Sequence, residues 1–143
     1  MTDAQPDRPI RCRGVRGAIT VEANTAEAIL AATHELLTAL VNANGVEPDD
    51  ISAVWFTTTT DLDAAYPAVA ARQLGWTDAA LMCAHEMSVP GGLPKCVRVL
   101  ILWNTPHGAR DSSYLPPGRG RAAPGTSGPD DPIVSLSARR EAA

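Results

Sequence analysis

The feature that most constrains the fold is an apolar run over residues 97–103, V-R-V-L-I-L-W, which contains a single arginine. The run follows a loop over residues 88–95 that holds two prolines and two glycines. A short apolar run that begins directly after turn residues is typical of a strand buried within a sheet. In an extended strand Arg98 shares one face with Leu100 and Leu102, and the residues between them face the other way. The sequence therefore predicts a sheet built around this strand, with a charge on one side.

An amphipathic helix is the second strong signal. Asn24 is a suitable N-cap residue, and Glu27 follows three positions later, as in a capping box. Apolar residues then recur with a helical period over residues 29–41, and Gly45 supplies a left-handed stop. A shorter helix is expected over residues 66–74.

Three further strands complete the expected domain. They cover residues 10–22, interrupted near Gly14 or Gly17, residues 53–58 and residues 79–83. Strands and helices do not alternate in regular β-α-β units, so we expect the α+β class, with a mixed β-sheet and packed helices.

The composition divides the chain into three parts. Residues 1–9 are polar and predicted to be a flexible leader, and residues 10–115 form the domain, with Tyr114–Leu115 as a possible short last strand. Residues 116–143 are rich in proline and glycine, and such a segment buries too little apolar surface to order itself. We predict a mobile tail there.

Charge and cysteine content exclude several classes of protein. A net charge of −4 and a pI near 5.2 argue against a nucleic-acid or anionic-membrane binder. Three cysteines without a C-x-x-C pair indicate a reducing compartment. The N-terminus has no apolar stretch typical of a signal peptide, so a cytoplasmic location is expected.

Arginines are the candidate binding residues. An arginine keeps its charge, so Arg98 needs an anionic partner or water. The structural interpretation pairs it with Glu86 or places it at an exposed strand end. The functional interpretation combines Arg98 with Arg16, Arg72 and Tyr114 in a pocket for a dicarboxylate, because arginine binds carboxylates through two parallel hydrogen bonds.

Metal and nucleophile chemistry are not expected. Cys83, His85, Glu86 and Cys96 do not have the spacing of a zinc site. Cys83 and His85 lack a third group to orient them as a nucleophile pair. We therefore expect no metal and no cofactor.

Five segments occur in an order and spacing that resemble the trimeric, non-helical class of monofunctional bacterial chorismate mutases. They are R-G-V-R-G-A-I-T-V-E (13–22), T-D-L-D-A-A-Y-P-A-V-A-A-R-Q-L-G (60–75), C-A-H-E-M (83–87), G-G-L-P-K-C-V-R-V-L (91–100) and Y-L (114–115). The resemblance covers about residues 11–115. It implies a homotrimer with a pseudo-α/β-barrel core, active sites between adjacent subunits, and rearrangement of chorismate to prephenate in phenylalanine and tyrosine biosynthesis.

The resemblance also implies roles for individual residues. Arg98 donates to the ether oxygen of chorismate and is left unpaired within its strand for that purpose, and Glu86 holds the ring hydroxyl. Five further residues are implied to bind the substrate. Arg16 clamps a substrate carboxylate, with Tyr114 beside it. Cys83 is a neighbouring thiol, Tyr66 is an apolar wall, and Arg72 is a basic residue at the pocket edge. Wall and thiol come from one subunit, and the first clamp arginine, the glutamate and Arg98 come from the next.

Two other functions remain open at this point. The same scaffold can act on another chorismate-derived acid in specialised metabolism. Alternatively, the protein is a non-catalytic trimer that binds small anions or a partner protein.

Overall fold

The computed structural model describes residues 8–106, 121–122 and 134–135. Its elements, in chain order, are β1 (Arg11–Thr20), α1 (Ala26–Asn44), the 3-10 helix η1 (Pro48–Asp50), β2 (Ile51–Thr58), α2 (Ala68–Gln73), β3 (Ala80–His85), β4 (Cys96–Thr105), β5 (Arg121–Ala122) and β6 (Val134–Ser135). Each expected strand and helix between residues 10 and 103 is present, with ends shifted by a few residues.

The strands form one mixed sheet in the order β3-β2-β4-β1-β6-β5. Strand β4, which contains the apolar run, lies between β1 and β2 and is antiparallel to both. Strands β2 and β3 are parallel, and α2 lies between them in the sequence. The α+β class is confirmed, and the predicted buried strand is central to the sheet.

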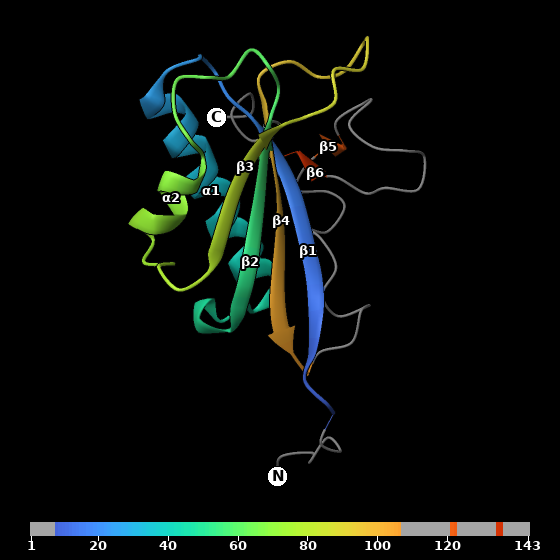
Figure 1. Ribbon diagram of the computed structural model, residues 1–143. Coiled ribbons are helices and arrows are strands. Elements are labelled where there is room, and N and C mark those ends of the chain that lie inside the picture. The colour runs from blue at the N-terminus through green and yellow to red at the C-terminus, as the bar shows by residue number, and fades with distance from the viewer. Residues whose placement is uncertain (1–7, 107–120, 123–133, 136–143) are drawn as a thin grey trace.

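Helix α1 covers one face of the sheet, with α2 beside it (Figure 1). Ile29, Leu36, Leu37 and Leu40 of α1 are fully buried in the same core as Phe56 of the sheet. The alternation of strand side chains aims Val97, Val99 and Ile101 at this helical layer. The core therefore lies on one side of the sheet.

Strand β1 is continuous, so the expected interruption at Gly14 or Gly17 was wrong. Gly17 instead lets the helix approach the sheet closely. A Cβ atom on Gly17 would lie 3.0 Å from Leu36 and 3.2 Å from Leu40, which is tighter than ordinary contact. The glycine is needed for helix packing, and the strand passes through it undisturbed.

The N-cap of α1 is Thr25, not Asn24 as expected. The Thr25 side chain accepts a hydrogen bond from the Ala28 N–H group, and its backbone is extended. Asn24 instead binds the loop before α2: its Oδ1 accepts from the N–H groups of Asp63 and Ala64 at 3.0 and 3.1 Å. Contacts with a loop distant in sequence thus decide which of the two suitable residues, Asn24 or Thr25, caps the helix. The predicted stop is confirmed, because Gly45 has a φ of 66°.

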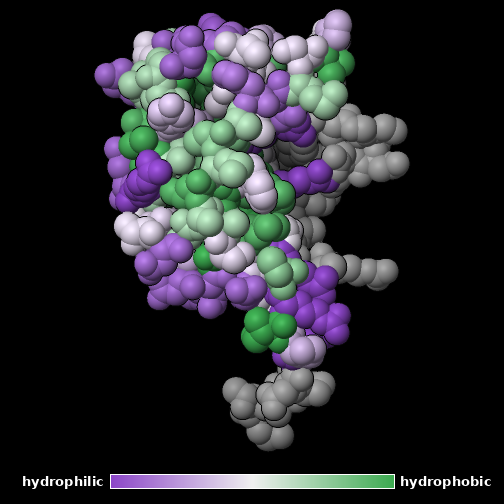
Figure 2. All heavy atoms as spheres, viewed as in Figure 1, coloured by the Kyte–Doolittle hydropathy of each residue, from purple (hydrophilic) through white to green (hydrophobic). Residues whose placement is uncertain are grey.

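Among the described residues, no helix covers the other face of the sheet (Figure 1). We call it the open face; the strand register places on it Gly14, Arg16, Ala18, Ala53, Trp55, Thr57, Ala80, Met82, Ala84, Arg98, Leu100 and Leu102. Trp55 and Met82 are 42% and 56% exposed although both are large and apolar. Figure 2 shows hydrophobic residues gathered over the middle of the molecule in the view of Figure 1, with polar residues around them.

Two short strands fall within the segment that we expected to be a tail. Strand β6 is parallel to β1, with Ser135 opposite Ala18, and β5 is antiparallel to β6. The other residues of that segment, Tyr114–Leu115 and residues 1–7 lie outside the described residues, so the division into leader, domain and tail stays a prediction. Among the helices of the described residues, none is both long and apolar enough to cross a bilayer.

Candidate active site

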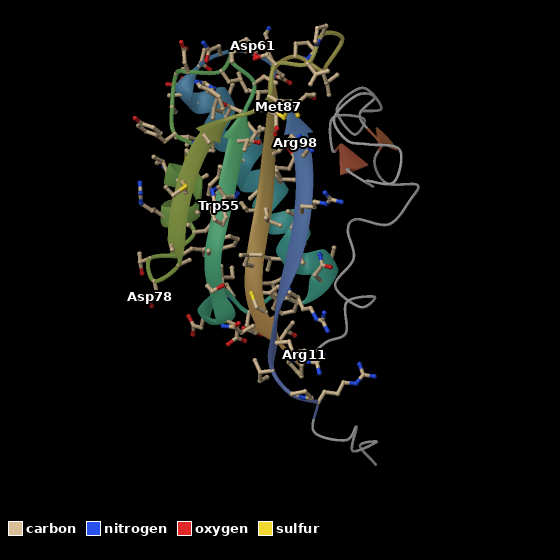
Figure 3. The ribbon with its side chains drawn as sticks, turned by 45° about the vertical axis from the view of Figure 1, so that its right-hand side comes forward. Arg11, Trp55, Asp61, Asp78, Met87 and Arg98 are labelled. Atoms are coloured by element: carbon tan, nitrogen blue, oxygen red, sulfur yellow. The ribbon has the colours of Figure 1, made fainter. Side chains whose placement is uncertain are left out.

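A cavity of about 500 Å³ lies on the open face, within the size range of small-molecule sites. We call it the first cavity. Figure 3 shows Arg98 near the start of β4 and Trp55 further along the sheet on β2. The cavity is lined by Gly14, Arg16, Gly17, Trp55, Thr57, Glu86, Arg98, Val99 and Leu100. Arg16, Arg98 and Glu86, all proposed from the sequence, therefore line the same cavity.

Arg98 and Glu86 form an ion pair in this cavity. The distance from Arg98 Nη1 to Glu86 Oε2 is 2.8 Å, and about a quarter of each side chain is exposed. The structural interpretation of the sequence paired Arg98 with Glu86, and this pair is present; the role of Arg98 toward a substrate stays a prediction. A guanidinium offers five N–H donors in a planar fork, so one bond to Glu86 still leaves donors for a ligand.

Strand β2 holds Glu86 at two points. The backbone N–H of Glu86 donates to the carbonyl of Thr58 at 2.8 Å, which extends the parallel β2–β3 pairing by one residue. The Thr57 hydroxyl donates to Glu86 Oε2 at 2.7 Å, and the N–H of Met87 donates to Oε1 at 3.3 Å. The carboxylate is thus fixed in place although it follows the last residue of its strand.

The surroundings keep Glu86 ionised. Partial burial raises the pKa of Glu86, but the Thr57 hydrogen bond and the positive charge of Arg98 outweigh burial, so this pKa lies below its usual value. The nearby Cys96 has the opposite balance, because burial raises the pKa of its thiol to about 11. At neutral pH the cavity therefore presents a carboxylate and a guanidinium, and the buried Cys96 thiol beside them is uncharged.

Arg16 reaches the first cavity from β1. It lies opposite Leu100 of β4, one step along the open face from the Ala18–Arg98 pair. Its guanidinium and that of Arg98 belong to neighbouring strands, and both side chains are partly buried. Two such cations beside one cavity suit a ligand with two carboxylates.

Tyr66 and Cys83 line a second cavity of about 450 Å³, together with Thr58, Leu62, Asp63, Ala64, Ala65, Pro67, Ala84 and His85. Asn24 fixes the loop that forms one wall of it, through the bonds to Asp63 and Ala64. Tyr66 is 73% exposed, so its ring is presented to the outside of the subunit. The residues that line the second cavity do not line the first.

Two proposed residues remain outside these cavities. Arg72 is exposed on α2 and is not among the residues that line either cavity. Tyr114 lies outside the described residues. Within the part of the chain that the structure describes, no group of three or more His, Cys, Asp or Glu side chains is arranged to hold a metal ion.

Sequence reasoning missed Thr57 and Trp55. Both belong to a strand that was predicted, but its pairing with β4 was not, and only the register places Thr57 opposite Arg98 and Trp55 opposite Leu100. The available signal was the alternation along β2, which puts Trp55 and Thr57 on one face. It indicates a shared face and not which partner lies across the sheet.

Comparisons with known proteins agree with one another. The family model described as chorismate mutase type I matches residues 12–116. The chain is 54% identical over 94 residues to chorismate mutase AroH of Thermus thermophilus, covering 65% of this chain and 77% of that protein. It is 44% identical over 94 residues to chorismate mutase AroH of Bacillus subtilis, covering 65% and 74%. A solved chorismate mutase from Clostridium thermocellum superposes with a TM-score of 0.68 at 51% identity, covering 71% of this chain and 93% of that one.

Proposed function

The chain belongs to the chorismate mutase type I family and is an isomerase of aromatic amino-acid biosynthesis, and we propose that it rearranges chorismate to prephenate in the first cavity. The observation that carries the proposal is the pairing of Arg98 with Glu86 in a cavity that also contains Arg16. Fixed charges of both signs, beside a second cation, match what this reaction demands.

The reaction is intramolecular, so the enzyme needs no nucleophile to perform it. The protein must hold the enolpyruvyl side chain over the ring, and binding in a reactive geometry lowers the barrier by removing conformational freedom beforehand. As the C–O bond stretches, negative charge grows on the ether oxygen. In our proposal, Arg98 donates to that oxygen, and a preorganised donor stabilises the transition state more than the substrate.

Glu86 and Arg16 have complementary roles in the proposal. Positive character develops on the ring during bond cleavage. The Glu86 carboxylate stabilises this positive character and accepts a hydrogen bond from the ring hydroxyl. Arg16 binds a substrate carboxylate from β1. The lowered pKa of Glu86 supports this role, because the carboxylate is charged before the substrate arrives.

We propose that the enzyme is a homotrimer whose sites are completed by an adjacent subunit. The charged groups line one cavity and the wall residues Tyr66 and Cys83 line another, so a second copy is needed to bring the two sets together. The exposed apolar side chains of the open face, Trp55 and Met82, support association through that face. Arg72 and Tyr114 are proposed to complete the pocket edge and the carboxylate clamp.

We also propose a cytoplasmic location. Cys12, Cys83 and Cys96 are all free thiols, as expected of a protein kept in a reducing compartment.

The direct test follows the loss of chorismate ultraviolet absorbance on addition of the purified protein, with the product separated by chromatography. Prephenate formation well above the rate in buffer is expected, and Arg98→Ala protein serves as the control for a contaminating mutase. No acceleration would support the non-catalytic trimer. A product other than prephenate would support an enzyme of the same scaffold acting in specialised metabolism.

A further inference from the structure

Thr57 lies between the two charged residues of the site. The sheet order places β2 between β3 and β4, so Glu86, just after β3, reaches Arg98 on β4 by crossing over β2. Thr57 is the residue of β2 directly opposite Arg98 in the register. Its hydroxyl donates to the same carboxylate oxygen, Oε2, that accepts from Arg98. The Arg98–Glu86 ion pair therefore lies above the Thr57 hydroxyl, which itself binds Glu86.

The two oxygens of Glu86 are used differently. Oε2 accepts from Thr57 at 2.7 Å and from Arg98 at 2.8 Å, both within the range of strong charge-assisted bonds. Oε1 accepts only a longer bond of 3.3 Å, from the N–H group of Met87, among the interactions found for the described residues. Oε1 is thus the oxygen with spare capacity for a substrate hydroxyl, and its direction is set by the bonds to Oε2.

We propose that Thr57 is a positioning residue for the chorismate mutase reaction, which holds the Glu86 carboxylate in its productive orientation while Arg98 turns to the substrate. The inference rests on the proposed role of Glu86. When Arg98 donates to the ether oxygen, its bond to Oε2 weakens. Thr57 is then the side-chain donor that remains on Oε2, so the carboxylate neither rotates nor follows the guanidinium.

The Thr57 hydroxyl, together with the nearby positive charge, keeps Glu86 ionised. Among the described residues, the charged and titratable groups near Glu86 are Arg98 and the neutral thiol of Cys96 on β4, Arg16 on β1, and His85, which precedes it on β3. Since burial raises the pKa of Glu86 and the Thr57 bond lowers it, loss of the hydroxyl moves this pKa upward.

The first test compares Thr57→Val, which keeps the shape and removes the donor, with Thr57→Ser, which keeps the donor. Thr57→Val is expected to lower kcat about 10- to 100-fold, as for loss of a hydrogen bond to a charged group, with a smaller change in KM. The acid limb of the kcat/KM profile is expected to move to higher pH. Thr57→Ser should recover most of both effects. Thr60→Val, in the exposed turn after β2, is the matched control and should behave as wild type.

Wild-type kcat and an unmoved acid limb in Thr57→Val would overturn the proposal. Equal losses in Thr57→Val and Thr57→Ser would assign Thr57 a packing role and overturn it as well.

A second measurement separates this proposal from the proposed function. The carboxyl carbon of Glu86 is titrated by carbon-13 NMR in the wild type and in Thr57→Val, without any turnover. An upward shift of the Glu86 pKa supports the Thr57–Glu86 bond, and no shift overturns it. If Glu86→Ala protein is fully active, the assigned site of the reaction fails, whatever the titration gives. If Glu86→Ala is impaired, adding Thr57→Val should cause little further loss in kcat, because Thr57 acts through Glu86.

Discussion

Arg98 and Glu86 form an ion pair of 2.8 Å although their strands are not neighbours in the sheet. Strand β2 lies between them, and its backbone and the Thr57 side chain both bind Glu86. The relationship requires β3 to be parallel to β2, so that its end and Glu86 arrive beside Thr57 and Thr58. The site is therefore a product of sheet topology, and each member of it can be altered separately.

Replacement of Arg98 should stop catalysis without unfolding the protein. Loss of a preorganised donor at a developing negative charge typically lowers kcat by about 10²–10³-fold. We expect at least this loss in Arg98→Ala, and a severe loss in Arg98→Lys, because lysine lacks the planar fork. Steady-state kinetics and circular dichroism measure rate and fold together. A folded Arg98→Lys protein with near-wild-type kcat would contradict the electrostatic role.

The charge of Glu86 should set the acid limit of activity. Because the folded-state pKa of Glu86 lies below its usual value, the carboxylate stays ionised through neutral pH, and kcat/KM should fall only as pH drops through that lowered pKa. Glu86→Gln should remove this acid limb and retain more kcat than Glu86→Ala, since an amide still binds a hydroxyl. Equal kcat values for the two variants would refute a role for the charge.

Subunits with different defects should restore activity to each other. Arg98→Ala removes one of the two arginines of the first cavity, and Tyr66→Asp places a charge on the exposed wall of the second. With random mixing in a symmetric ring, about a quarter of the sites combine two intact halves. Activity of the two variants, refolded together, measures this. Arg98→Ala mixed with Glu86→Ala is the control and should stay inactive, because both changes affect the same half. A fully active monomer in sedimentation would contradict the shared site.

Gly17 should tolerate no side chain, and Gly14 should. The Cβ of Gly17→Ala would meet Leu36 and Leu40 at 3.0 to 3.3 Å, and overpacking of this kind costs about 1–3 kcal/mol of the free energy of unfolding. The Cβ of Gly14→Ala would lie at 3.4 Å or more from the nearest atoms, in ordinary contact. Urea unfolding of both variants decides the matter. Equal destabilisation would mean that helix approach does not explain Gly17.

Local patterns predicted the elements well, because they depend on neighbours in sequence. Gly45 ends α1 through its own backbone conformation, and the apolar run formed the central strand as expected. Choices made by distant contacts were not predictable from such patterns. Asn24 and Thr25 are both good N-cap residues, and the loop at Asp63 selected between them.

The site shows the same division between local and distant information. The motifs indicated Arg16, Glu86 and Arg98, and all three line one cavity. The Arg98–Glu86 pairing and the place of Thr57 depend on strand order and register, which residue spacing does not specify. Tyr66 and Cys83 were expected to belong to another half of the site, and they line a separate cavity.

The antiparallel pairing of β1 with β4 has a consequence for synthesis on the ribosome. Arg11 lies opposite Thr105, so β1, which leaves the exit tunnel first, cannot pair with β4 until β4 has been synthesised. A nascent chain that ends before residue 96 lacks β4, which pairs with β1 along its whole length, and also lacks the cation at position 98. Closing so long a loop is slow relative to forming local structure. Helix α1 can form during translation, whereas the centre of the sheet and the first cavity assemble only after β4 has emerged.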